Sequence, residues 1–168
     1  MDTIIALSSG SLPSGVAVVR LSGPKSAQFL SSIAGKLPEP RQVSLRTLKT
    51  TKAENVDDAL ILWFPKPASF TGEDVAELHL HGGKAVVAKV LEMATAIGGI
   101  RLAEAGEFSR RAFSNGKMDL TAAEGLADLI DAETEAQRKA AHYLASGGLR
   151  DLYEGWQERL LDARAQIE

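Results

Sequence analysis

The stretch that most constrains the fold is DVAELHLH, residues 74–81, because apolar and polar side chains alternate along it. Successive side chains of a strand point to opposite faces. Its alanine and two leucines would therefore face a core, while Glu77, His79 and His81 would share the other face. Two glycines then interrupt the strand, and residues 84–99 carry apolar side chains at helical spacing. This pattern predicts a sheet with one apolar face and one polar face.

Segments on both sides of this unit predict further strands and helices. Pro24 suits the first turn of a helix, and Gly35 suits its end. We therefore predict one α+β unit over residues 1–118. Its other predicted helices cover residues 22–35 and 106–113, and its other predicted strands cover residues 3–7, 16–21, 43–49, 58–64 and 100–103.

After residue 118 the sequence becomes helical and acidic. Residues 1–118 hold 14 Lys/Arg against 11 Asp/Glu, and residues 119–168 hold 5 against 11. This asymmetry indicates either two units with different roles or a solvated acidic helix face. Apolar spacing predicts one helix from residue 120 to the glycines at 147 and 148, with a capping box of Thr121 and Glu124, and then a second helix.

The helical pattern continues to the end of the sequence. Two amphipathic helices bury little surface without further partners. Residues 119–168 are therefore predicted to be the first helices of an incomplete all-α domain. We expect an exposed apolar face over residues 120–167.

The composition excludes several kinds of site. A chain without cysteine has no disulfide, thiolate nucleophile, zinc ribbon or iron–sulfur cluster. No serine lies in a G-x-S-x-G motif, and no GxxxxGK[ST] phosphate loop occurs. The N-terminus does not resemble a signal peptide. No stretch approaches the roughly 18 apolar residues of a membrane span, so we predict a cytoplasmic protein.

Two polar clusters are candidate binding sites. In the first, Glu77, His79 and His81 could share a metal ion, but we favour a pocket wall or a solvent-facing strand. The second lies in GEFSRRAFSNGKMDL, where Arg110, Arg111 and Lys117 are close in sequence. Arginine and lysine suit carboxylate or phosphate recognition, so this cluster is either an anion site or a solvated helix and loop.

Long blocks of the sequence resemble a known family. They read DTIIAL…SGVAVVRLSG, LWFPKPASFTGEDVAELHLHGG and AEAGEFSRRAFSNGKMDLTAAEGLADLIDAET. In this order, and from residue 2 to the end of the chain, they resemble the MnmE (TrmE) family of tRNA modification GTPases. The resemblance implies a tetrahydrofolate-binding and dimerisation domain over residues 1–118, similar in fold to folate-dependent aminomethyltransferases. It also implies that residues 119–168 begin a helical domain into which a Ras-like GTPase domain is inserted.

The same resemblance implies a function for the whole protein. With MnmG, a partner that uses FAD and NADH, the family adds a carboxymethylaminomethyl-type group to carbon 5 of the wobble uridine of tRNA. A formyl- or methylene-tetrahydrofolate supplies a one-carbon unit. GTP, Mg²⁺ and K⁺ belong to the GTPase domain, which is absent here, so this chain is not expected to hydrolyse GTP.

The family's folate-contacting residues correspond to Arg20, Glu77 and Lys117. A carboxylate such as Glu77 can accept hydrogen bonds from the pterin edge, and Arg20 and Lys117 can meet carbonyl or carboxylate oxygens. No catalytic residue or metal ligand is assigned. Two alternatives stay open, a stand-alone folate-dependent aminomethyltransferase-like enzyme and a dimerisation scaffold with a vestigial pocket.

Overall fold

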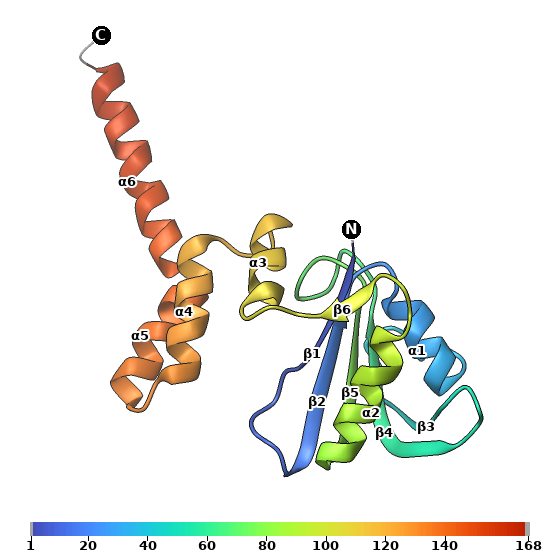
Figure 1. The fold of residues 1–168 in the computed structure, drawn as a ribbon. Helices are drawn as coiled ribbons and strands as arrows, with labels where there is room; N and C mark the ends of the chain where they lie inside the picture. The colour runs from blue at the N-terminus through green and yellow to red at the C-terminus, as the bar shows by residue number, and fades with distance from the viewer. Residues whose placement is uncertain (1, 167–168) are drawn as a thin grey trace. The chain divides into compact units, whose positions relative to one another are not determined.

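The structure, a computed structural model, describes residues 2–166 and divides into two compact units, Met1–Ala112 and Phe113–Glu168. The first unit is built on a six-stranded sheet with the strand order β3-β4-β5-β2-β1-β6 (Figure 1). β1 and β6 run parallel, and every other neighbouring pair is antiparallel. The predicted α+β fold with a mixed sheet is therefore confirmed. The strands are β1 (Thr3–Leu7), β2 (Ser14–Ser22), β3 (Ser44–Lys49), β4 (Asn55–Phe64), β5 (Val75–Gly82) and β6 (Ile100–Leu102).

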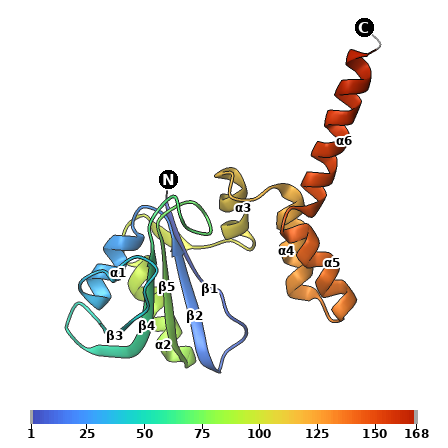
Figure 2. The same ribbon diagram turned by 180° about the vertical axis from the view of Figure 1, so that it is seen from behind.

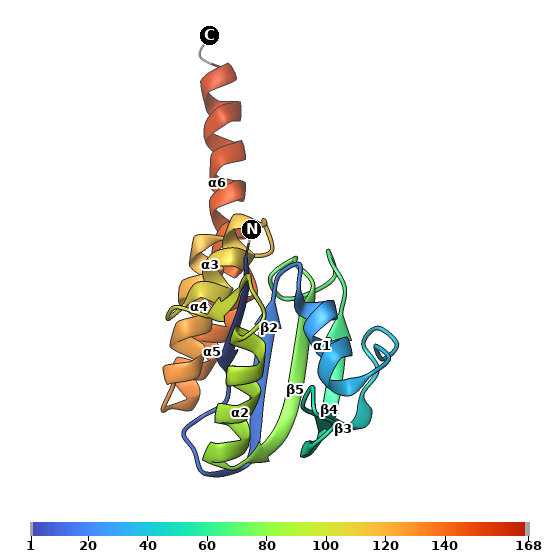
Figure 3. The same cartoon turned by 45° about the vertical axis from the view of Figure 1, so that its right-hand side comes forward.

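Two helices, α1 (Ser26–Ala34) and α2 (Lys84–Thr95), cover one face of this sheet (Figure 3). Phe29 and Leu30 of α1 are fully buried, as is Val90 of α2, and all three join the core formed with the strands. Burying such side chains is the main favourable term in folding this unit.

The first helix starts later than the sequence predicts. Gly23, at the end of β2, has φ of +132°, outside the helical region. A Cβ atom at this position would lie 2.7 Å from Thr3 Cα, so only glycine allows β1 to approach so closely. The chain turns here, and the helix begins at Ser26.

The alternation in β5 divides its side chains between the two faces as predicted. Ala76, Leu78 and Leu80 are buried in the core under the helices. Glu77 and His79, at the intervening positions, are only half-buried on the opposite face. Figure 2 shows the strands in front of α2, from the side of this second face.

The second unit contains three helices within the described residues, α4 (Leu120–Asp131), α5 (Glu135–Ala145) and α6 (Gly148–Ala165). The predicted single helix from residue 120 to 146 is wrong, because residues 132–134 leave the helical conformation between α4 and α5. Thr134 and Gln137 form a capping box that starts α5. Gly125 of α4 packs so tightly against Leu144 that an added Cβ would lie 2.7 Å from its side chain.

The capping box predicted for Thr121 and Glu124 is also wrong. Asp119 is the N-cap of α4, and its carboxylate accepts a hydrogen bond of 2.7 Å from the backbone N–H of Ala122. The Thr121 hydroxyl donates to the same carboxylate at 2.8 Å. Both aspartate and threonine are favoured as N-cap residues, and in this helix Asp119 rather than Thr121 occupies the N-cap position.

Large apolar side chains are exposed along the helices of the second unit. This confirms the predicted apolar face for the described residues; residue 167 lies outside them. Over residues 2–166, no helix is long and apolar enough to cross a membrane. The exposed side chains are Leu120, Ile130, Tyr143, Leu152, Tyr153, Trp156, Leu160 and Leu161.

Candidate functional site

The candidate site lies on the face of the sheet opposite α1 and α2, where β2 and β5 run side by side. Their register places Arg20 directly across from Glu77. Arg20 Nε donates to Glu77 Oε1 at 2.8 Å, and Arg20 Nη2 lies 2.8 Å from the same oxygen. The two side chains are 27% and 18% exposed, so the pair is sheltered but accessible. Two residues predicted to bind folate are therefore brought together.

Two aromatic rings surround the Arg20 guanidinium. Its Cζ lies 5.4 Å from the ring centroid of Phe70 and 5.8 Å from that of Phe108. Both distances are within the range of a cation–π interaction. Phe70 comes from the loop between β4 and β5, and Phe108 from α3 (Glu107–Ser114). Sequence reasoning missed both residues, although each is an aromatic residue within a polar, glycine-containing segment.

The pair leaves hydrogen-bonding groups for a ligand. Glu77 uses Oε1 for Arg20, and among the described residues Oε2 meets only His79 Nε2, at 3.6 Å, too far for a hydrogen bond. The guanidinium carries five N–H groups, of which this pairing engages one edge. An unused acceptor of Glu77 and unused donors of Arg20 thus lie on neighbouring side chains, a set that suits a polar ligand with both donors and acceptors.

The two histidines have different surroundings. His81 Nδ1 lies 2.6 Å from Asp57 Oδ1, and this hydrogen bond raises the pKa of the exposed His81 imidazole above its usual value. His79 Nε2 is buried and makes no hydrogen bond with the described residues. Within residues 2–166, no group of three or more His, Asp or Glu side chains is arranged to hold a metal ion.

Arg111 is buried in an ionic network that fixes α3 to the sheet. It donates to the Glu73 carboxylate at 3.1 and 3.3 Å, to Asp2 Oδ1 at 2.7 Å and to Glu107 Oε1 at 3.1 Å. The alternative of a solvated helix and loop is wrong for Arg111, because this residue is buried. Its guanidinium pairs with three carboxylates of the chain itself, so we do not assign it to an external anion. Arg110 is exposed and pairs with Glu104 at 3.0 Å.

Glu107 lies at the centre of the same network. Arg101 donates to its two oxygens at 2.8 and 2.6 Å, and the backbone N–H of Glu104 donates at 2.9 Å. These hydrogen bonds, with Arg101 the largest contributor, lower the pKa of the buried Glu107 carboxyl to about 2. Glu73 in turn accepts a 2.6 Å hydrogen bond from the Ser22 hydroxyl. The network therefore joins Asp2, which directly precedes β1, to β2, the β4–β5 loop, β6 and α3.

Lys117, the third residue predicted to bind folate, lies between α3 and α4 and is exposed. It belongs to the second unit, whereas Arg20 and Glu77 belong to the first. Its role at the folate site stays a prediction.

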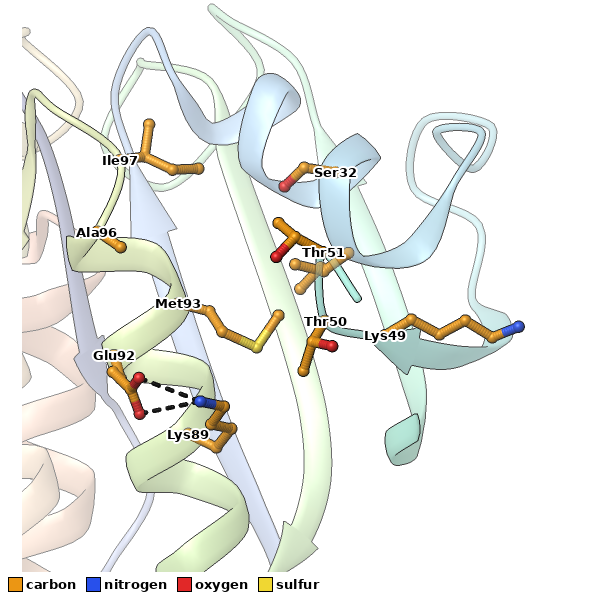
Figure 4. Close-up of a pocket in the computed structure, with 10 residues that line it drawn as sticks. Ser32, Lys49, Thr50, Thr51, Lys89, Glu92, Met93, Ala96 and Ile97 are labelled. Atoms are coloured by element: carbon orange, nitrogen blue, oxygen red, sulfur yellow. Dashed lines mark hydrogen bonds and ion pairs between the residues drawn. The ribbon is translucent and has the colours of Figure 1, made fainter. Parts of the chain in front are cut away.

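A separate cavity of about 360 Å³ lies on the helix-covered side of the first unit, between α1, α2 and the β3–β4 turn (Figure 4). Several of its polar groups have internal partners. Lys89 pairs with Glu92 at 3.1 Å, the Thr50 hydroxyl accepts from turn N–H groups, and the Ser32 hydroxyl donates to the Phe29 carbonyl. We do not assign this cavity a role.

Comparison with known families matches both units. Residues 3–117 match the family described as GTP-binding protein TrmE N-terminus, and residues 120–168 match the MnmE helical domain. The tRNA modification GTPase MnmE of Brucella canis is 60% identical over 167 residues, which are 99% of this chain and 38% of that protein. The protein of the same name from Rhizobium meliloti is 58% identical over the same shares. The chain thus spans about 38% of the length of the curated relatives it matches.

Proposed function

The chain belongs to the MnmE (TrmE) family, and we propose that it carries the folate-binding part and the first helices of the helical part of a tRNA modification GTPase. The observation that carries the folate proposal is the Arg20–Glu77 pair on the open face of the sheet. It is sheltered, preorganised and supplied with an unused carboxylate oxygen and unused guanidinium N–H groups. The fold proposed for residues 1–118 is that of folate-dependent aminomethyltransferases.

A reduced folate fits the donor set of this site. Its pterin is planar and has N–H donors on one edge, which Glu77 Oε2 could accept. Arg20 could donate to a carbonyl or carboxylate oxygen of the same ligand, and Lys117 is proposed as a further cation for it. When bound, a formyl- or methylene-tetrahydrofolate supplies a one-carbon unit. The residues of this chain would bind and orient it.

Calorimetric titration with 5-formyl-tetrahydrofolate tests this proposal. Glu77→Gln removes the carboxylate charge, and we expect it to weaken binding by about 1.5–3 kcal/mol, the range for a hydrogen bond to a charged group. Glu92→Gln is the matched control, because Glu92 lines the cavity on the helix-covered side. If Glu77→Gln binds the ligand as tightly as the unaltered chain, Glu77 is not a folate contact.

The remaining steps are proposed for the whole protein. GTP hydrolysis, with Mg²⁺ and K⁺, would belong to a domain outside this chain, because the 168 residues contain no GxxxxGK[ST] phosphate loop. We propose that the whole protein works with MnmG on the wobble uridine of tRNA, and hence in the cytoplasm. Partners for the exposed apolar side chains of α4, α5 and α6 would come from the rest of the helical domain.

Homodimerisation through the first unit is supported by apolar side chains on the open face of its sheet. Leu45 and Leu60 are paired across β3 and β4 and are 64% and 43% exposed, and Val16 is 57% exposed. Exposed apolar surface of this kind is typical of an interface. We expect Leu60→Arg to shift sedimentation velocity from dimer toward monomer. Leu102→Arg, on the edge strand β6, should leave it unchanged, and equal effects of the two substitutions would contradict this interface.

A further inference from the structure

We propose that Phe70 and Phe108 are positioning residues for the Arg20–Glu77 site, and that they hold the Arg20 guanidinium in its binding orientation by cation–π contact. The proposal rests on the proposed function in assigning a folate to that site, but the restraint on Arg20 exists without a ligand. Neither aromatic residue is among the positions that the family resemblance carries over.

The geometry around Arg20 supports a restrained side chain. Arginine has four rotatable side-chain bonds and loses considerable entropy when it is fixed. A single carboxylate oxygen, Glu77 Oε1, fixes one edge of the guanidinium but leaves it free to pivot about that oxygen. The rings of Phe70 and Phe108, at 5.4 and 5.8 Å, supply the further contacts that oppose this rotation.

The two rings are themselves held by one buried network. Phe108 lies between Glu107 and Arg111, the two residues that tie α3 to the sheet. Phe70 precedes Thr71 and Glu73, which both bond to the Ser22 hydroxyl at 2.6 Å. Arg111 bonds to Glu73 and thereby connects both ring-bearing segments.

This arrangement explains why so many charged groups are buried beside an open sheet face. A buried ionic network contributes little net stability when compared with apolar packing of the same volume. It does define orientation, because each charge accepts few geometries. We infer that the network fixes where the rings lie, and that the rings fix Arg20 before a ligand arrives. A preorganised contact binds more tightly, because its ordering entropy is lost during folding.

Substitutions of Phe108 separate aromatic contact from simple packing. Phe108→Leu keeps an apolar side chain without a ring, whereas Phe108→Tyr keeps the ring face. Phe113→Leu is the control, since Phe113 is an exposed phenylalanine on the same helix. Phe70→Leu, in the β4–β5 loop, removes the other aromatic contact of Arg20 without altering α3.

The first readout is the Nε–H signal of Arg20 in nitrogen-15 NMR of the unliganded chain, assigned by its loss in Arg20→Lys. We expect exchange of this proton with water to be several times faster in Phe108→Leu and in Phe70→Leu. It should be unchanged in Phe108→Tyr and Phe113→Leu. If Phe108→Leu and Phe70→Leu, folded by circular dichroism, leave the exchange rate unchanged, the positioning role is refuted.

The second readout is affinity for 5-formyl-tetrahydrofolate by calorimetry. Loss of one cation–π contact should raise Kd about two- to fivefold in Phe108→Leu, with recovery in Phe108→Tyr. Failure of the two proposals can be distinguished. If the exchange rate of the Arg20 proton depends on both rings but the chain binds no folate, the proposed function alone is contradicted. If Phe70→Leu and Phe108→Leu both bind folate as tightly as the unaltered chain, the positioning role alone is contradicted.

Discussion

Replacing Glu107 with glutamine should destabilise the first unit strongly at neutral pH and only weakly in acid. In the folded chain the pKa of this carboxyl falls from 4.5 to about 2, chiefly because Arg101 donates to both of its oxygens. Each pKa unit corresponds to about 1.4 kcal/mol, so the ionised carboxylate contributes roughly 3 kcal/mol at pH 7. Glutamine has no charge and would turn an amide N–H₂ group toward the arginines.

The pH dependence has a definite sign. The folded pKa is below the unfolded one, so the contribution of Glu107 is complete above about pH 4.5 and is lost as the pH falls toward 2. The difference in the free energy of unfolding between the unaltered chain and Glu107→Gln should therefore shrink from roughly 3 kcal/mol at pH 7 to about half of that at pH 3.

Urea unfolding at the two pH values measures this difference. In a Trp156→Phe background, fluorescence of the buried Trp63 reports on the first unit alone. Glu104→Gln is the control, because its exposed pair with Arg110 should be worth less than about 1 kcal/mol. Glu107→Gln could instead lower the free energy of unfolding by less than Glu104→Gln, or by equal amounts at pH 7 and pH 3. Either result would refute an ionised Glu107 at the centre of the network.

Three further substitutions test local features. Asp57→Asn should lower the pKa of His81 toward 6.5 in an NMR titration, because the Asp57 carboxylate accepts from the imidazole and raises its pKa; an unchanged titration would contradict that pairing. Gly125→Ala should destabilise the second unit by about 1–3 kcal/mol through collision with Leu144. A Cβ atom added at Gly155 would meet nothing within 4 Å outside its own helix backbone. Gly155→Ala should therefore stabilise the second unit by up to about 1 kcal/mol, because alanine favours the helix more than glycine does. Thermal unfolding followed by circular dichroism at 222 nm compares these two, and the reverse order would contradict the packing of α4 on α5.

Periodicity predicted the parts of the fold that depend on burial. The alternation around Glu77 was sufficient to place it on the polar face, because one face of β5 packs against helices and a slip of one residue would bury Glu77 instead. The break between α4 and α5 was missed, since the apolar spacing continues through it. The cap at Thr134 and the contact at Gly125 are the features that signal it.

The candidate site was predicted only in part. The resemblance supplied Arg20 and Glu77, and strand pairing brings them together. Two partners of Arg111, Glu73 and Asp2, could not be predicted, because they lie 38 and 109 residues away and only the folded chain brings them together. The aromatic contacts of Arg20 depend on the same long-range packing.

The pairing of Asp2 with Arg101 and Arg111 also sets when the first unit can finish folding during synthesis. The strand that begins at Thr3 pairs in parallel with β6, which is made almost a hundred residues later. At the usual rate of translation, roughly 5–20 s pass between synthesis of Asp2 and of Arg111. Until β6 and α3 have been made, β1 lacks its parallel neighbour and Asp2 lacks both of its arginine partners.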